Sequence, residues 1–299
     1  MRPLQPQATV SAVDAGVPGI GLIMLSQVRN YRSRFEAALS NVGAGLGSLG
    51  RFARDAVDLI YPPLCTVCAC DAPSGSPLCE RCLADLAQTG REHPCTACGR
   101  PVGERGETRE TTACPWCDGR GVGRIKRVAR LGLLAPPLRE VIHHMKFHGR
   151  WELADWLGRR LALDTAVQRV LVGADAIVPV PLHAARQAHR GYNQAMQLAR
   201  RLGRASGLPV LQPAVRARST VAQTSLSSVV ARQKNLRDAF VLLHPRMVVG
   251  RRLVLVDDVM TTGATLRSFG QCLWRGRPAG LSAVVAAIAD PRGRGFQTV

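Results

Sequence analysis

The stretch LVLVDDVMTTGATL, residues 253–266, indicates the fold class of this 299-residue chain. Its first four residues are all apolar, which is typical of a strand buried on both faces of a parallel sheet. Asp257 and Asp258 follow at the expected carboxyl edge of that sheet, where open α/β folds bind their ligands. Small residues then lead into a helix predicted over Ala264–Trp274. We therefore expect an α/β fold with a ligand site at this edge.

The segment after the acidic pair has the composition of a phosphate-binding loop. Small residues let an anion approach the backbone, and the first N–H groups of a helix, together with its dipole, attract a phosphate. Two neighbouring carboxylates would repel that phosphate unless they bind hydroxyl groups or a metal ion, and ribose hydroxyls meet this need. The alternative is that the acidic pair caps a turn before an ordinary helix start. The candidate phosphate ligands are Thr261, Thr262, Gly263, Ala264 and Thr265.

Strand-like and helix-like runs alternate around this stretch. Such alternation implies right-handed crossovers and a mostly parallel sheet flanked by helices. Strands are predicted over Val128–Leu134, Ala176–Val180, Leu208–Val215, Leu253–Asp257 and Leu281–Ala289. The further helices are predicted over Pro137–Phe147, Trp151–Leu163, Asn193–Ser206 and Ser227–Asn235.

A second group of candidate anion ligands follows the predicted strand Ala176–Val180. It begins with the Pro-Val-Pro-Leu segment at 179–182 and continues through Arg186 to Arg-Gly-Tyr-Asn-Gln at 190–194. Arginine suits pyrophosphate because its planar guanidinium binds two oxygens at once. Each arginine taken alone fits a solvated helix face equally well. Further members of the group are Arg218, Thr220, Gln223, Arg232 and Asn235.

Eight of the ten cysteines form four Cys-x-x-Cys pairs. Four thiolates in two such pairs are the layout of a structural zinc site, in which no coordination position stays open. The segment shows little apolar periodicity, so we expect it to need metal to fold. Crossed pairing between the groups, a redox pair and an iron–sulfur cluster are the alternatives. The candidate ligands are Cys65, Cys68, Cys79 and Cys82, then Cys95, Cys98, Cys114 and Cys117.

Two cysteines and several histidines lie outside this pattern. Cys272 falls on the predicted helix after the phosphate loop and is expected in the core, whereas Cys70 has no expected role. A cluster of three histidines around Lys146 favours a basic helix surface over a metal site, and His93 is a weaker candidate ligand. The three histidines are His143, His144 and His148.

The formal net charge of +19 favours polyanionic partners such as nucleic acid or phosphorylated small molecules. Nearly all the cations are arginines, and a GC-rich genome alone can produce such a bias, which is the explanation of the charge that we favour. The aromatic content of 4% is low for a base-stacking surface. No stretch reaches the roughly 18 apolar residues of a membrane helix, and the cysteine spacing indicates a reducing compartment. We expect a cytoplasmic protein without membrane insertion.

Residues 254–266 resemble the phosphoribosyl-pyrophosphate (PRPP) signature of type I phosphoribosyltransferases. With the Pro-Val-Pro-Leu and Arg-Gly-Tyr-Asn-Gln segments, the later Thr-x-x-Gln and Arg-x-x-Asn motifs and the cysteine pairs, the chain is similar to the ComF family from about Ile60 to Asp290. The family, also called ComFC or GntX-like, has a phosphoribosyltransferase-like domain behind a zinc ribbon. Tyr192 stands where the family more often has Phe.

The resemblance implies roles for particular residues. Asp257 and Asp258 would bind the ribose 2′- and 3′-hydroxyls, and the loop after them the 5-phosphate. Lys146 would be a further anion contact. The pyrophosphate loop would comprise Val180, Pro181 and Leu182, with Arg186 and Arg190 beyond it, and the hood over the site would include Thr220 and Gln223, with Arg232 and Asn235 nearby.

The resemblance also implies cofactors, partners and boundaries. PRPP would bind with Mg²⁺ and donate its phosphoribosyl group to an unknown acceptor, while one or two zinc ions would be structural. Competence members of the family act in the uptake of single-stranded DNA with a helicase partner, so the resemblance makes DNA handling an alternative function. Sensing of PRPP or a nucleotide without turnover is a third. We expect an extension over 1–55, disordered and then helical, with Met24 as an alternative start. A double zinc ribbon over 56–125, a phosphoribosyltransferase-like domain over 126–290 and a tail over 291–299 would follow.

Overall fold

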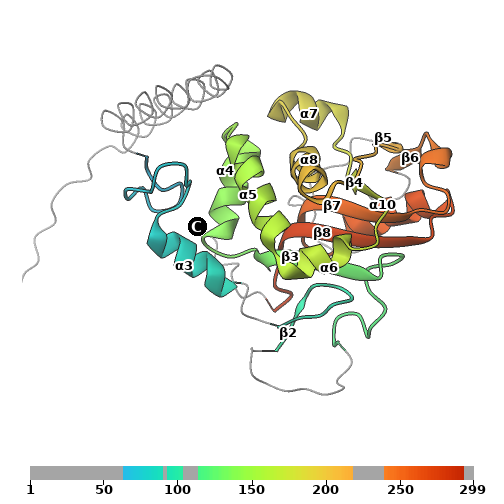
Figure 1. Ribbon diagram of the computed structural model, residues 1–299, viewed down its shortest axis with the longest axis horizontal. Helices are drawn as coiled ribbons and strands as arrows, with labels where there is room; N and C mark the ends of the chain where they lie inside the picture. The colour runs from blue at the N-terminus through green and yellow to red at the C-terminus, as the bar shows by residue number, and fades with distance from the viewer. Residues whose placement is uncertain (1–62, 90–92, 104–113, 218–238, 293–299) are drawn as a thin grey trace, which may run out of the picture. The chain divides into compact units, whose positions relative to one another are not determined.

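The computed structural model describes residues 63–89, 93–103, 114–217 and 239–292 (Figure 1). All of them belong to one compact unit. The predictions for the N-terminal extension, the helix Ser227–Asn235 and most of the C-terminal tail lie outside the described residues.

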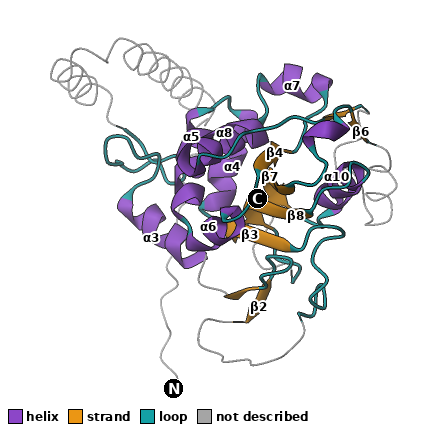
Figure 2. Ribbon diagram, turned by 45° about the vertical axis from the view of Figure 1, so that its right-hand side comes forward, coloured by secondary structure: helices purple, strands orange, loops and turns teal. Residues whose placement is uncertain are grey.

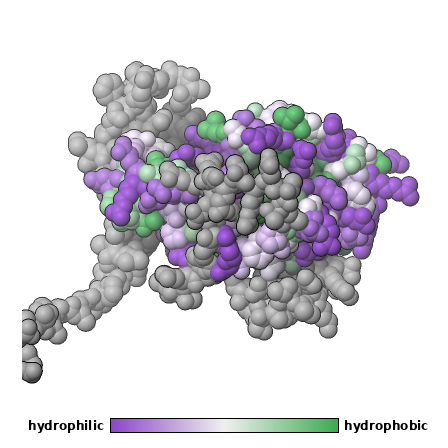
Figure 3. All heavy atoms as spheres, turned by 90° about the horizontal axis from the view of Figure 1, so that it is seen from below, coloured by the Kyte–Doolittle hydropathy of each residue, from purple (hydrophilic) through white to green (hydrophobic). Residues whose placement is uncertain are grey.

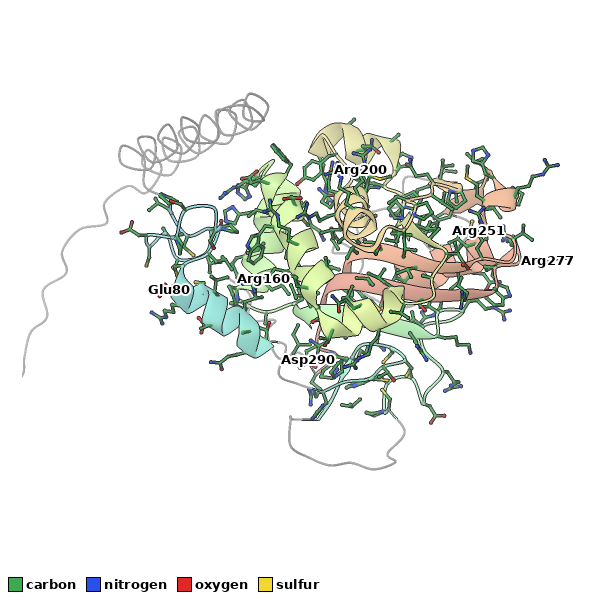
Figure 4. The ribbon with its side chains drawn as sticks, viewed as in Figure 1. Glu80, Arg160, Arg200, Arg251, Arg277 and Asp290 are labelled. Carbon is green, nitrogen blue, oxygen red and sulfur yellow. The ribbon has the colours of Figure 1, made fainter. Side chains whose placement is uncertain are left out.

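A parallel sheet organises the described residues. Its strands are β3 (Arg127–Leu133), β4 (Ala176–Pro179), β7 (Arg252–Met260) and β8 (Gly280–Ile288), in the spatial order β3-β8-β7-β4. All three neighbouring pairs run parallel. Figure 4 labels Arg251 and Arg277, which precede β7 and β8, and Asp290, which follows the carboxyl end of β8. The predicted α/β class with a mostly parallel sheet is confirmed.

Helices cover both faces of the sheet (Figure 2). On one face, Val254 and Val256 of β7 share a core with four helices, and on the other face Leu253 and Leu255 share a second core with α10 (Ala264–Trp274). Successive side chains of a strand point to opposite faces, so the apolar run of β7 supplies both cores. The four helices are α4 (Leu138–Phe147), α5 (Glu152–Leu163), α6 (Thr165–Leu171) and α8 (Gln194–Ser206).

The predicted strand Leu208–Val215 is wrong as a single element. Its middle forms one parallel bridge from Val210 to Ile177, beside β4. Its end belongs to β5 (Ala214–Arg216), which pairs antiparallel with β6 (Phe240–Leu242), just before the short 3₁₀ helix η2 (Pro245–Met247). The two prolines at 209 and 213 lack the N–H groups that a continuous ladder requires.

Three of the described helices were not predicted from the sequence. They are α3 (Glu80–Thr89), α6 and α7 (Ala184–Arg190), none longer than ten residues. The helix α6 begins where the Asp164 carboxylate accepts hydrogen bonds from the N–H groups of Ala166 and Val167, at 2.9 and 3.0 Å. Such a cap compensates for the shortness of the helix. The helix α3 carries Cys82 and Leu86 into the same core as α4 and α5, so the cysteine segment contributes to that core.

On the face that Figure 3 shows, the described hydrophobic residues lie in small separate groups among hydrophilic ones. No described helix combines the length and the hydropathy that crossing a bilayer requires. A short antiparallel pair, β1 (His93–Pro94) and β2 (Pro101–Gly103), flanks the second cysteine group.

Candidate functional site

The acidic pair lies inside β7, because this strand continues to Met260 and does not end at Asp257 as predicted. The parallel pairing with β8 extends through both acids, from Asp257 opposite Val285 to Met260 opposite Ile288. Neighbouring residues of a strand face opposite sides of the sheet. Asp258 faces α4, where Lys146 Nζ lies 3.0 Å from its Oδ2.

Burial, and after it the neighbouring Asp258 carboxylate, raise the pKa of Asp257, which is about 7 once all its neighbours are counted. The positive charges of Lys146 and Arg216 act in the opposite direction, as does the N–H of Asp258, which donates to Asp257 Oδ1 at 2.9 Å. The charged form of this carboxyl is therefore short of partners. Hydroxyl donors or a cation would stabilise it.

The predicted phosphate loop lies directly after the acidic pair. Thr261, Thr262 and Thr265 are half-buried, and Gly263 adopts a left-handed conformation, with φ of 78°, as the N-cap of α10. The hydroxyl of Thr262 accepts a hydrogen bond from the N–H of Ala264 at 3.3 Å. The first N–H groups of a helix lack intrahelical partners, so this end of α10 has the geometry of an anion site.

The Pro-Val-Pro-Leu segment lies beside the acid-bearing strand. The N–H of Val180 donates to the carbonyl of Val256 at 2.9 Å, one residue before the acidic pair. Asn193, the N-cap of α8, donates from Nδ2 to the carbonyl of Val180 at 3.2 Å. The loop with Pro181 and Leu182 is thus held at the same edge of the sheet as the acids.

Tyr192 links α4 to the turn between α7 and α8. Its hydroxyl donates to the carbonyl of Met145 at 2.6 Å, across 47 residues of sequence, next to Lys146. A phenylalanine at this position would lack the bond. The tyrosine hydroxyl therefore adds a contact that holds the carboxyl end of α4.

Three arginines have interacting positive charges, and one of them, Arg216, acts on Asp257. On α7, burial and the neighbouring charge of Arg190 lower the pKa of Arg186. On β5, burial and the charge of Arg186 lower the pKa of Arg216, Asp257 acts in the opposite direction, and the resulting pKa is about 10. A polyanion bound among these cations would relieve their mutual repulsion.

Arg216 was not among the residues singled out in the sequence. The signal was available, because Arg216 and Arg218 alternate with Val215 and Ala217 in a strand-like pattern. Among the predicted site residues, the structure brings together the acidic pair, the phosphate loop, Lys146 and the loop after β4 with Val180, Pro181 and Leu182, called the β4 loop below. The predicted hood residues Thr220, Gln223, Arg232 and Asn235 lie outside the described residues.

The eight paired cysteines form two separate clusters, each with four sulfurs within 4.8 Å of one another. Cys68 and Cys79 are 3.6 Å apart in the first, and Cys98 and Cys114 are 3.7 Å apart in the second. A tetrahedron with Zn–S bonds of about 2.3 Å separates its sulfurs by about 3.8 Å. The clusters thus fit structural zinc, and each is made of two consecutive pairs, which excludes the crossed alternative.

Local interactions act unequally on the thiols of the second cluster: hydrogen bonds favour the thiolate of Cys95, whereas the hydrogen bond with Cys95 raises the pKa of Cys98 and burial raises that of Cys114. The thiol of Cys98 and the backbone N–H groups of Cys98 and Ala97 lower the pKa of Cys95 to about 4, against the opposing effect of burial. Among the described residues, no histidine joins a metal cluster. The side chains of His143, His144 and His148 contact one another ring to ring instead, and Cys272 is buried in the core as predicted.

Family models match two parts of the chain. A double zinc ribbon domain matches residues 56–118, and a phosphoribosyl transferase domain matches residues 188–297. The first range contains both cysteine clusters, and the second contains β7 with its acidic pair, the phosphate loop and α10.

Several bacterial proteins are similar over most of this chain. The DNA utilization protein YhgH of Escherichia coli K12 is 35% identical over 217 residues, which are 71% of this chain and 84% of that protein. Competence protein ComFC of Bacillus subtilis is 28% identical over 69% of this chain and 81% of its own length. Competence protein F of Haemophilus influenzae is 38% identical over 48% of this chain and 64% of its own length.

A solved structure is similar over a smaller part. It is the glutamine PRPP amidotransferase from B. subtilis complexed with ADP and GMP, at 23% identity and a TM-score of 0.31. The similarity covers 44% of this chain and 25% of that one.

Proposed function

The chain belongs to the ComF family, and from this premise we propose that it binds PRPP with Mg²⁺ and transfers the phosphoribosyl group to an acceptor. One observation carries the proposal. A pair of adjacent acids, one paired with a lysine and the other half-buried with a raised pKa, leads within a few residues to the N-terminus of α10. Sites for hydroxyl groups and for a phosphate therefore lie next to each other, as a phosphorylated ribose requires.

Each group of residues has a distinct part in the proposed binding. The carboxylates of Asp257 and Asp258 would accept hydrogen bonds from the two ribose hydroxyls. The helix start with Thr261 and Thr265 would bind the 5-phosphate, and the β4 loop with Arg186 would face the pyrophosphate. Thr220 and Gln223 stay predicted members of a hood over the site.

The proposed reaction is a substitution at C1 of the ribose. The bond from C1 to pyrophosphate breaks, and both electrons leave with the pyrophosphate oxygen through an oxocarbenium-like transition state. A nitrogen of the acceptor supplies the pair for the new bond and loses its proton. The protein contributes positioning and fixed charges, so no catalytic triad is needed.

The residues present are compatible with Mg²⁺ in this site. Carboxylate and phosphate oxygens are the ligands that Mg²⁺ prefers, and the raised pKa of Asp257 marks a place where added positive charge is favourable. When bound with PRPP, Mg²⁺ would neutralise charge on the leaving pyrophosphate. The positive charges of the arginines and Lys146 would balance the negative charge of the ligand that Mg²⁺ does not neutralise.

The test is binding of PRPP by the zinc-loaded full chain in the presence of Mg²⁺, measured by calorimetry and by the shift in unfolding temperature. We expect saturable binding with stabilisation of the fold. The double variant Asp257→Asn/Asp258→Asn should lose most of the affinity. Asp85→Asn, an exposed acid on α3, is the matched control and should bind like the parent chain.

The outcomes separate the candidate functions. Failure of millimolar PRPP to stabilise the parent chain would overturn the proposal. Binding without release of pyrophosphate, in the presence of a panel of nitrogenous acceptors, would favour a sensor over an enzyme.

Handling of single-stranded DNA is the second candidate function. Two large aromatic side chains near the site are exposed, Phe147 by 58% and Trp151 by 50%, and the Arg190 guanidinium lies 5.2 Å from the Phe147 ring centre. Exposed aromatic rings beside cations are suited to stacking nucleobases along a charged backbone. The names of the relatives, DNA utilization protein and competence protein, point in the same direction.

This second function is tested with oligo(dT) at increasing salt. We expect the affinity to fall steeply with salt, because lysine and arginine side chains that bind DNA phosphates displace the counterions of the DNA. Phe147→Ala should weaken binding several-fold, whereas Leu163→Ala, another exposed apolar residue, should not. A flat salt response would exclude this function, and equal effects of the two variants would exclude Phe147 as a stacking residue.

A further inference from the structure

The second cysteine cluster contacts the phosphate loop through Arg100. The guanidinium Nη2 of Arg100 donates to the carbonyl of Thr262 at 3.2 Å, across 162 residues of sequence. Arg100 also belongs to the turn around the first two cysteines of this cluster, because its own carbonyl accepts a hydrogen bond from the N–H of Cys95 at 2.8 Å. Formation of that turn therefore positions the guanidinium.

Hydrogen bonds attach this turn to β3, an edge strand of the parallel sheet. The buried Arg130 of β3 donates from Nε to the carbonyl of Gly99 at 2.8 Å, and the N–H of Val128 donates to the carbonyl of Thr96 at 3.3 Å. A Cβ on Gly99 would come within 2.6 Å of Ile288 Cδ1 of β8, which shows how closely the Gly99 backbone packs against that side chain. The metal cluster is thus anchored to β3 and β8, which belong to the same sheet as β7, the strand that leads into the phosphate loop.

A second contact reaches the same peptide. Val122, five residues after Cys117, is buried, and its Cγ1 would lie 3.0 Å from a Cβ on Gly263. Val122 is held by a pair of backbone hydrogen bonds with Ile125, at 2.9 and 3.1 Å. The cysteine segment therefore contacts both residues of the Thr262–Gly263 peptide bond, Thr262 through Arg100 and Gly263 through Val122.

The direction of this peptide matters for an anion. In a planar trans peptide the C=O and the N–H point to opposite sides. Because Arg100 draws the Thr262 carbonyl toward the cysteine cluster, the N–H of Gly263 points away from that cluster. A reversed peptide would turn the carbonyl oxygen, with its partial negative charge, toward the opposite side.

We propose that Arg100 is a positioning residue that holds the Thr262–Gly263 peptide with its N–H available to the phosphate of the ligand. The inference rests on the proposed function, since it assigns this loop to a ribose 5-phosphate group. It gives the second cysteine cluster a specific part in ligand binding, beyond the folding of its own segment. The first cluster has other neighbours, such as Arg150, which donates to Thr66 Oγ1 at 3.2 Å.

The test compares Arg100→Ala with Arg120→Ala in the zinc-loaded full chain. Arg120 follows Cys117 in the same cluster and is exposed, so its loss removes the same charge without the loop contact. Calorimetry with ribose 5-phosphate should show about a tenfold loss of affinity for Arg100→Ala, because the Gly263 N–H is no longer held toward the phosphate. Arg120→Ala should keep the parent affinity, and Arg100→Lys should restore part of the loss.

Two further readouts exclude a purely structural effect. Zinc content should be the same in all variants, and the ¹⁵N–¹H resonance of Gly263 should shift in Arg100→Ala but not in Arg120→Ala. Parent-like affinity and an unmoved Gly263 resonance in Arg100→Ala would overturn the inference while leaving the proposed function intact. If the parent chain itself does not bind ribose 5-phosphate or PRPP, the proposed function fails, and this inference fails with it.

Discussion

Lys146, at the carboxyl end of α4, forms an ion pair with Asp258 of β7 at 3.0 Å, with side-chain exposures of only 18% and 12%. The pair joins a helix to the sheet at the point where the phosphate loop begins. Asp257 lies on the other face of β7, and its pKa is raised. The two carboxylates are neighbours in sequence but have different partners.

Removal of the lysine should destabilise the fold. In Lys146→Met, Asp258 would keep a poorly solvated charge without its partner, and we expect a loss of about 3 kcal/mol in the free energy of unfolding. The measurement is chemical denaturation at neutral pH. Arg159→Met, which breaks an exposed pair with Asp155, should cost less than about 0.5 kcal/mol. Equal losses in the two variants would contradict the partly buried character of the Lys146 pair.

Affinity for ribose 5-phosphate should rise with pH because of Asp257. Burial and Asp258 raise the pKa of Asp257 to about 7, so the carboxylate that would accept ribose hydroxyls forms only as the pH rises through neutrality. We expect several-fold tighter binding at pH 8 than at pH 6, measured by calorimetry. The phosphate itself ionises near pH 6 and contributes in the same direction.

The Asp257→Asn variant isolates the contribution of the protein. It should bind more weakly at pH 8 and should retain only the shallower dependence that comes from the phosphate. The same pH profile for variant and parent would show that Asp257 does not control the ionisation relevant to binding.

Gly263→Ala should impair both stability and ligand binding. The left-handed φ of 78° costs an L-residue about 1–2 kcal/mol, and the new Cβ would press on Val122 at 3.0 Å. We expect a loss of about 2 kcal/mol in stability and at least tenfold weaker binding of ribose 5-phosphate. Gly207→Ala, at φ of 73° with no neighbour within 4 Å, should lose about 1 kcal/mol and bind normally.

Metal analysis should find about two zinc ions in each chain. Each cysteine cluster has the sulfur spacing of one tetrahedral site, so Cys82→Ser should reduce the content to about one. Cys70→Ser is the control, since Cys70 is exposed and belongs to neither cluster. A parent chain with a single zinc ion would show that one of the two clusters is not a zinc site.

Local patterns predicted the central elements closely. The apolar run before Asp257 and the small residues before α10 correctly indicated a buried strand and a helix from Ala264 to Trp274. Both depend on residues close together in sequence, where periodicity and capping signals act. The extension of β7 through the acids was not apparent, because pairing with β8 overrides the low strand propensity of aspartate.

The chain's own sequence determined the α/β class, the acidic pair followed by a Thr-Gly helix start, and the two groups of four cysteines. Each of these features lies within a short stretch of sequence, because a single strand, a single helix start or a single metal site is formed by residues close together in the chain. The tertiary structure alone decided that Lys146 pairs with Asp258, that Arg216 acts on the charge of Asp257 and that Arg100 binds the carbonyl of Thr262. Such contacts join residues as far as 162 positions apart, and they exist only because the parallel sheet brings the ends of its strands and their loops to one edge.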